Sequence, residues 1–188
     1  MRRSVLLFFL FAGDTVLFAA GSPDLLVAIR NGDHVQVQKL LGTGADVNTV
    51  DNDGTTALMH SVIESDVKMM NLLIGHGANV NAKNALASTA LMYAATNLAK
   101  ARVLLDAGAD VKARGKYGAT PMNVAVTAFG STPVLKLLVS KGAEPEARLM
   151  ASAAAMGDLE AMQYLLSVGV PEGGSHGGCN LSGHSRAM

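Results

Sequence analysis

Apolar and small residues recur along this chain in a fixed order. Five Leu-Leu pairs are each followed by a glycine three or four residues later. The apolar run before each pair predicts a helix, and the glycine predicts its end, because glycine reaches left-handed backbone angles without a side-chain clash. The glycines lie 33, 31, 34 and 27 residues apart, and spacing of this size predicts a stacked-repeat solenoid. They are Gly44, Gly77, Gly108, Gly142 and Gly169.

The other end of the repeated unit carries a helix-start pattern. Thr56, Thr89 and Thr120 are each followed by a small residue or proline and then by an apolar residue. We expect the threonine hydroxyl to cap the first helical turn, where proline is also tolerated. Each unit is therefore predicted as a turn, a helix, a tight loop, a second helix and a glycine stop. The fold class that follows is an all-α repeat solenoid.

With both ends defined, the unit resembles the ankyrin repeat. The unit that starts at Asp51 carries the family's spaced residues from Thr56 through Leu73 to Asn81, but Met59 stands where the family has histidine. The resemblance implies helix-loop-helix units joined by short β-hairpin-like turns. The first and last units are irregular, as expected of units with only one neighbour. The predicted units are 22–50, 51–83, 84–114, 115–148 and 149–170.

The first residues of the chain do not belong to the repeats. Arg2 and Arg3 precede an apolar stretch, and small residues follow at Ala19 and Ala20. This order predicts a signal peptide over residues 1–21 and export to the periplasm or the medium. The alternative is an uncleaved membrane anchor, but Asp14 leaves the apolar run shorter than the roughly 20 residues of a spanning helix. After cleavage we expect no membrane contact.

The chain ends in a Gly/Ser/His-rich tail, residues 171–188, which is predicted to be disordered because it has few apolar residues to bury. Its His176, Cys179 and His184 lack the paired spacing of zinc sites, so no metal and no cofactor are expected. The net charge of zero gives no sign of nucleic-acid binding. His60 and Glu64 are four residues apart on one predicted helix and are expected to form an exposed ion pair rather than an acid-base dyad.

The ankyrin resemblance implies a non-enzymatic module that binds another protein, its partner unidentified, through hairpin tips and first helices, and we expect a monomer. Leu86 and Tyr117 would form an apolar centre with Lys83, Arg114 and Lys116 beside it. The alternative is that Leu86 packs against the next hairpin and the cations only solvate the tips. A second possible function is a targeting or regulatory part of a larger enzyme. The predicted partner-binding residues are Asn52, Asp53, Ile63, Lys83, Leu86, Arg114, Lys116 and Tyr117.

Overall fold

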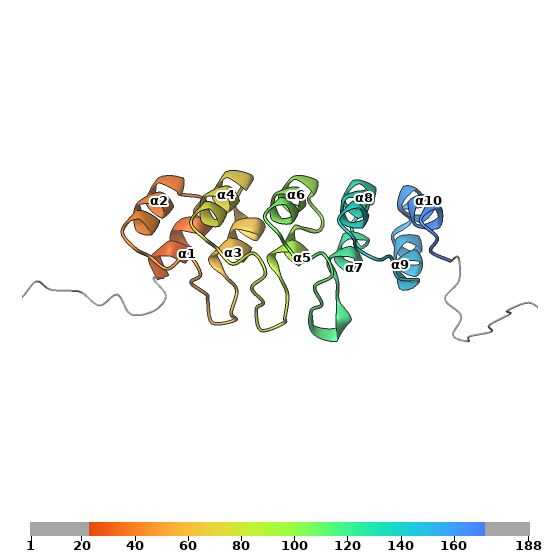
Figure 1. The fold of residues 1–188 in the computed structure, drawn as a ribbon, viewed down its shortest axis with the longest axis horizontal. Helices are drawn as coiled ribbons and strands as arrows, with labels where there is room; N and C mark the ends of the chain where they lie inside the picture. Colours follow the sequence, from red (N-terminus) through yellow and green to blue (C-terminus); the bar gives the residue numbers. More distant parts are fainter. Residues whose placement is uncertain (1–22, 172–188) are drawn as a thin grey trace, which may run out of the picture.

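The computed structural model describes residues 23–171, which form ten α-helices and one short 3-10 helix. Figure 1 shows the helices stacked as a row of pairs, with the odd-numbered helices in one layer and the even-numbered helices in the other. The pairs are α1 (Pro23–Arg30) with α2 (His34–Gly42), α3 (Ala57–Glu64) with α4 (Val67–Gly75), α5 (Ala90–Ala94) with α6 (Leu98–Asp106), α7 (Pro121–Ala125) with α8 (Thr132–Ser140), and α9 (Arg148–Met156) with α10 (Leu159–Ser167).

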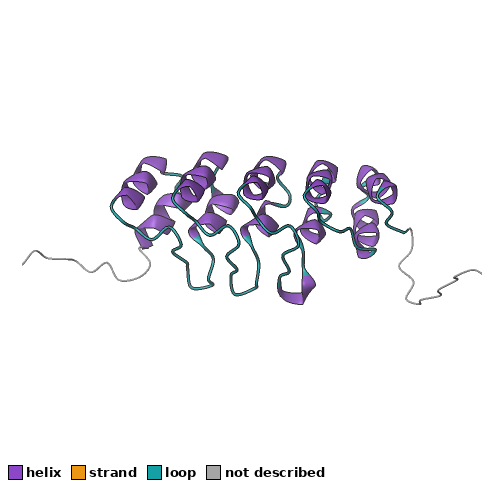
Figure 2. Cartoon of the chain, in the orientation of Figure 1, coloured by secondary structure: helices purple, strands orange, loops and turns teal. Residues whose placement is uncertain are grey.

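The predicted all-α repeat solenoid is confirmed. Figure 2 shows helices and loops throughout the described range, where a single β-bridge joins Val50 to Thr56. Between residues 23 and 171, no helix is long and apolar enough to cross a membrane. The predicted signal peptide and, apart from Pro171, the predicted tail lie outside the described residues.

Threonine caps were predicted at the start of three helices, and two of these caps are present. The Thr56 hydroxyl accepts a hydrogen bond from the Met59 amide at 3.2 Å, and Thr120 forms a reciprocal capping box with Asn123. The cap predicted at Thr89 is wrong, because its hydroxyl is buried and makes no hydrogen bond. There the Met92 amide bonds instead to the Thr89 carbonyl oxygen at 3.1 Å, which takes the donor that the hydroxyl would need.

Four of the five second helices begin at acidic or amide side chains that were not predicted, whereas α8 begins at Ser131 without a side-chain cap. Asp33, Asp66, Asn97 and Asp158 each accept a hydrogen bond from a backbone amide in the first turn of α2, α4, α6 and α10. These side chains satisfy amides that have no partner inside the helix. At the other end, all five repeat glycines have positive φ, between +87° and +94°. The glycine stops are therefore where the sequence predicted them.

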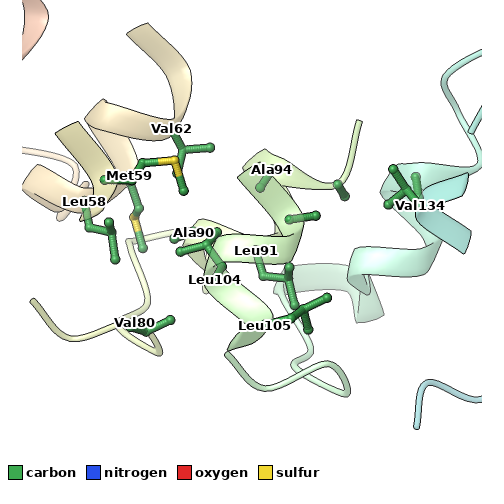
Figure 3. Close-up of a cluster of buried hydrophobic side chains, with 14 of the residues drawn as sticks. Leu58, Met59, Val62, Val80, Ala90, Leu91, Ala94, Leu104, Leu105 and Val134 are labelled. Atoms are coloured by element: carbon green, nitrogen blue, oxygen red, sulfur yellow. The ribbon is translucent and has the colours of Figure 1, made fainter. Parts of the chain in front are cut away.

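The core runs without interruption along the stack. Figure 3 shows Leu58, Leu91 and Leu104, from three helices of two neighbouring units, within one cluster of buried side chains. Each of them is at most 1% exposed, and full burial of a leucine contributes about 1.5–3 kcal/mol. Met59 is fully buried at the family's histidine position, so this position supplies core volume here rather than a hydrogen bond. Stability therefore depends on contacts between adjacent units.

Candidate protein-interaction surface

Three long loops project on the same side of the stack, below α3, α5 and α7 in Figure 1. Backbone hydrogen bonds join the tips of these loops. The Ala85 amide donates to the Asp53 carbonyl and the Lys116 amide donates to the Leu86 carbonyl, each at 2.9 Å. The repeated bond holds the three tips side by side. We call residues 51–55, 84–88 and 115–119 the tip row.

The first two tips are closed by the side chain of their first residue. The Asp51 carboxylate accepts hydrogen bonds from the amides of Asp53 and Thr55, both at 2.9 Å. Asn84 closes the second tip in the same way, through the amides of Leu86 and Ser88 at 3.0 and 2.9 Å.

The third tip differs because Gly115 has no side chain to close it. A Cβ at this position would make ordinary van der Waals contacts, 3.4 Å from the Met92 sulfur and 3.5 Å from the Ala87 carbonyl oxygen, so the available space does not itself require glycine. The tip instead forms the 3-10 helix η1 (Lys116–Gly118), in which Tyr117 has φ +62°. A non-glycine residue in the left-handed region costs on the order of 1–3 kcal/mol.

The predicted apolar centre is exposed on this row. Tyr117 is 91% exposed and Leu86 is 54% exposed. The Leu86 carbonyl makes the hydrogen bond to the next tip, while the side chain remains largely in solvent. The Lys116 ammonium lies 5.6 Å from the centre of the Tyr117 ring, within range of a cation–π interaction. Asn52 and Asp53 are also exposed on the tip row.

Ile63 is half exposed on α3, away from the tips. The structure therefore brings seven of the eight predicted residues to the tip row or to the loop legs beside it, while Ile63 stays on the helical surface.

The three predicted cations are in different environments. The Lys83 ammonium donates to the Arg114 carbonyl at 3.2 Å. The Arg114 guanidinium donates to the Glu146 carboxylate at 3.1 Å, so its charge is partly neutralised. Lys116 forms no ion pair with any described residue. Lys116 is therefore the cation that remains available beside Tyr117.

Comparison with known proteins bears on what such a surface does. The sequence profile described as ankyrin repeats (3 copies) matches residues 25–115 and 87–148. The chain belongs to the ankyrin-repeat family. A search of curated proteins finds no match to the chain. Ankyrin repeats are generally protein-protein interaction modules, and they are generally non-catalytic.

The charge of the ankyrin loops changes sign along the tip row. The loop before α3, residues 43–56, carries three aspartates and no lysine or arginine. The loop before α5, residues 76–89, carries Lys83 and no carboxylate. The loop before α7, residues 107–120, carries one aspartate and three cations. The row is therefore acidic at the second ankyrin unit and basic at the fourth.

A second polar cluster lies where the first ankyrin unit meets the second. His60 is only 6% exposed, and its Nε2 atom lies 2.9 Å from the Asp51 carboxylate and 3.2 Å from the Arg30 guanidinium. Its Nδ1 atom lies 3.6 Å from the Glu64 carboxylate. The pairing of His60 with Glu64 was predicted, but its predicted exposure is wrong, because Asp51 and Arg30 converge on the imidazole from the adjacent tip and from α1.

The same cluster holds Asp51 ionised. Burial alone would raise the pKa of Asp51, but hydrogen bonds from the Thr55 amide and from His60 outweigh burial and keep that pKa below its ordinary value. Among residues 23–171, no group of three or more His, Cys, Asp or Glu side chains has a geometry that could hold a metal ion. We interpret the cluster as a clamp that joins the first two units, and the spacing of His60 and Glu64 was the one sign of it in the sequence.

Proposed function

We propose that this ankyrin protein is a non-enzymatic module that binds a partner protein on the surface formed by the tip row and the first helices. Tyr117 is the anchor of this surface. The observation that carries the proposal is that an aromatic side chain is 91% exposed on a residue whose backbone is left-handed. Strained residues of this kind cluster at binding and active sites, and tyrosine is enriched among residues that dominate binding energy.

The rigidity of the tip supports an anchoring role for Tyr117. The Lys116 amide is bonded to the second tip, and the Gly115 amide bonds to the Ala119 carbonyl at 2.8 Å. A tip fixed on both sides loses little conformational entropy when a partner binds, which favours affinity. Leu86 extends the apolar contact to the neighbouring tip, and Lys116 adds a charge at its edge.

The test is an alanine substitution at each exposed apolar tip residue. A partner is captured with the purified protein from the source organism, and binding is then measured by surface plasmon resonance. Tyr117→Ala should weaken binding by at least about 2 kcal/mol, or roughly 30-fold, mainly through faster dissociation, because it removes a desolvated anchor. Phe129→Ala is the matched control, since Phe129 is a 77% exposed aromatic outside the tip row. Parental binding by both Tyr117→Ala and Leu86→Ala would exclude the tip row.

We also propose that the protein is exported. The proposal rests on the order of basic, apolar and small residues from Arg2 to Ala20, a stretch that precedes the described residues. N-terminal sequencing of protein from the native host should find a mature chain that begins near Gly21. A retained Met1 in a membrane fraction would contradict cleavage.

A further inference from the structure

The fifth ankyrin unit lacks the loop that the three preceding units share. Only seven residues, 141–147, connect α8 to α9, whereas residues 107–120 connect α6 to α7. Figure 1 shows long loops below α3, α5 and α7, and none below α9. The alignment of the units locates the missing segment. Arg148 occupies the place of Lys83 and Arg114, and Leu149 follows directly where six residues, 84–89, intervene in the third unit.

The missing loop leaves one side of the last tip without a neighbour. The Asp53 and Leu86 carbonyls each accept a hydrogen bond from the next tip. The equivalent carbonyl of the fourth unit belongs to Tyr117, and it accepts no hydrogen bond from the described part of the chain. The tip row therefore ends in an open backbone acceptor on Tyr117, the residue whose side chain is exposed.

A hollow of about 220 Å³ lies between the last long loop and residues 143–146. Its apolar lining includes Val111, Met122 and Ala143, and Met122 is only 3% exposed. Two ion pairs line the same hollow, Lys112 with Glu144 and Arg114 with Glu146. The complete lining is Val111, Lys112, Arg114, Thr120, Met122, Ala143, Glu144 and Glu146.

The charge around this opening is positive. Lys112, Arg114, Lys116 and Arg148 are cationic, whereas Glu144 and Glu146 supply the carboxylates. Arg148 already bonds to the Gly118 carbonyl at 3.0 Å and to Glu146 at 2.6 Å. Lys116, next to the open carbonyl, has no carboxylate partner among the described residues. Charge complementarity therefore calls for an acidic ligand.

We infer that this opening, which we call the fifth-tip gap, binds an acidic turn or extended segment of the partner protein in place of the missing loop. A backbone amide of the segment donates to the Tyr117 carbonyl, a small side chain enters the hollow, and a carboxylate lies against Lys116. The mode repeats the bond that already joins the chain's own tips, and main-chain pairing of this kind is a common means of peptide recognition. The inference rests on the proposed function and specifies the partner's chemistry.

A peptide from the chain itself provides the probe. Residues 45–57 contain the acidic tip of the second unit and carry three aspartates and no lysine or arginine. Asn52 holds the same position in its tip as Ala85 and Lys116 hold in theirs. The amides of Ala85 and Lys116 each donate to the preceding tip. We would label this peptide, cyclised head to tail, and measure its binding to the full chain by fluorescence polarisation. The control peptide carries asparagine at all three aspartate positions.

Two changes should each weaken binding of the acidic peptide at least tenfold. The first inserts Asp-Asn-Asp-Gly-Thr-Thr between Arg148 and Leu149, which restores a loop to the fifth unit and fills the gap. The second leaves the protein untouched and N-methylates the Asn52 amide of the peptide, which removes the pairing donor. The asparagine peptide should also bind at least tenfold more weakly. Circular dichroism verifies that the insertion variant is folded, and the methylated peptide gives an independent test if it is not.

Several results would overturn the inference. Equal binding by the acidic and asparagine peptides would exclude acidic recognition, and full binding by the methylated peptide would exclude pairing with Tyr117. If removal of residues 172–188 creates peptide binding that the full chain lacks, the occupant is the chain's own C-terminus. If the insertion abolishes self-association of the full chain, the occupant is a second copy. Failure of the proposed function would give a different pattern of results. The captured partner would bind the Tyr117→Ala variant as tightly as the parent protein, while the peptide results would be unchanged.

Discussion

Asp158 joins the fourth unit to the fifth, and removal of its side chain should destabilise the end of the stack. The side chain is 2% exposed, and each of its oxygens has one partner. Oδ1 accepts from the Ala161 amide at 3.0 Å in the first turn of α10, and Oδ2 accepts from the Gly130 amide at 2.9 Å in the loop before α8. One carboxylate therefore caps α10 and ties it to the fourth unit.

The size of the effect follows from these two bonds. Loss of an N-cap costs typically about 1 kcal/mol. A hydrogen bond to a charged group contributes about 1.5–3 kcal/mol, and Asp158→Ala also leaves the Gly130 amide without its partner. We expect a total of about 2–4 kcal/mol, concentrated in the fifth unit because repeat units contact only their neighbours.

Native-state hydrogen exchange is the assay for this prediction. In Asp158→Ala, amides of α10 such as Leu165 should exchange roughly 30- to 700-fold faster, since each 1.4 kcal/mol is a factor of ten. Amides of α3 and α4 should keep their protection. Asp33→Ala is the control, because Asp33 caps α2 through the Gln36 amide in an exposed setting, and its loss should cost only about 1 kcal/mol. Equal acceleration of exchange in α3 and α10, or equal losses of stability in the two variants, would contradict the prediction.

Four further predictions concern stability and binding. Leu73→Ala should cost about 2–5 kcal/mol in urea unfolding, because Leu73 is fully buried between units. Lys100→Met should cost about 1–3 kcal/mol by the same assay, because the Lys100 ammonium donates to the Val62 and Ser65 carbonyls at 2.6 and 2.9 Å. Lys116→Glu should slow association with the captured partner and reduce the salt dependence of the association rate. Association rates equal to those of the parent at two salt concentrations would contradict electrostatic steering by Lys116. Hydrogen bonds from the Met69 amide and then from His34 lower the pKa of Asp66 below its ordinary 3.8. The stability that Asp66 contributes is therefore full above pH 3.8 and is lost as pH falls through the lower folded pKa. Asp66→Asn should make acid unfolding depend less on pH in that range.

The sequence predicted the fold because the residues that set it are repeated. A Thr or a Gly that returns at the same place in several units can be recognised without knowing its neighbours, and the structure differs at Thr89, where a backbone bond displaces the cap. The surroundings of His60 could not be predicted in this way, because Arg30 lies 30 residues earlier and meets it only after the units stack.

The candidate surface was predictable in outline and not in detail. Position within the unit placed Leu86 and Tyr117 on tips. The pairing of Arg114 with Glu146 could not be predicted, because it joins residues 32 positions apart that meet only after the units stack. The left-handed backbone of Tyr117 was likewise not predictable, because a positive φ is uncommon for a residue with a side chain and the spacing of the units does not reveal it.

The change of charge along the tip row gives the surface a direction. A ligand laid along the row meets the aspartates of the second unit at one end and Lys116 at the other. A segment with its own basic and acidic ends can satisfy both in one orientation, while the reversed orientation sets like charges against each other at each end, at a cost of several kcal/mol. Under the proposed function, the row therefore favours one N-to-C polarity for such a segment, even where apolar contacts with Leu86 and Tyr117 would accept either.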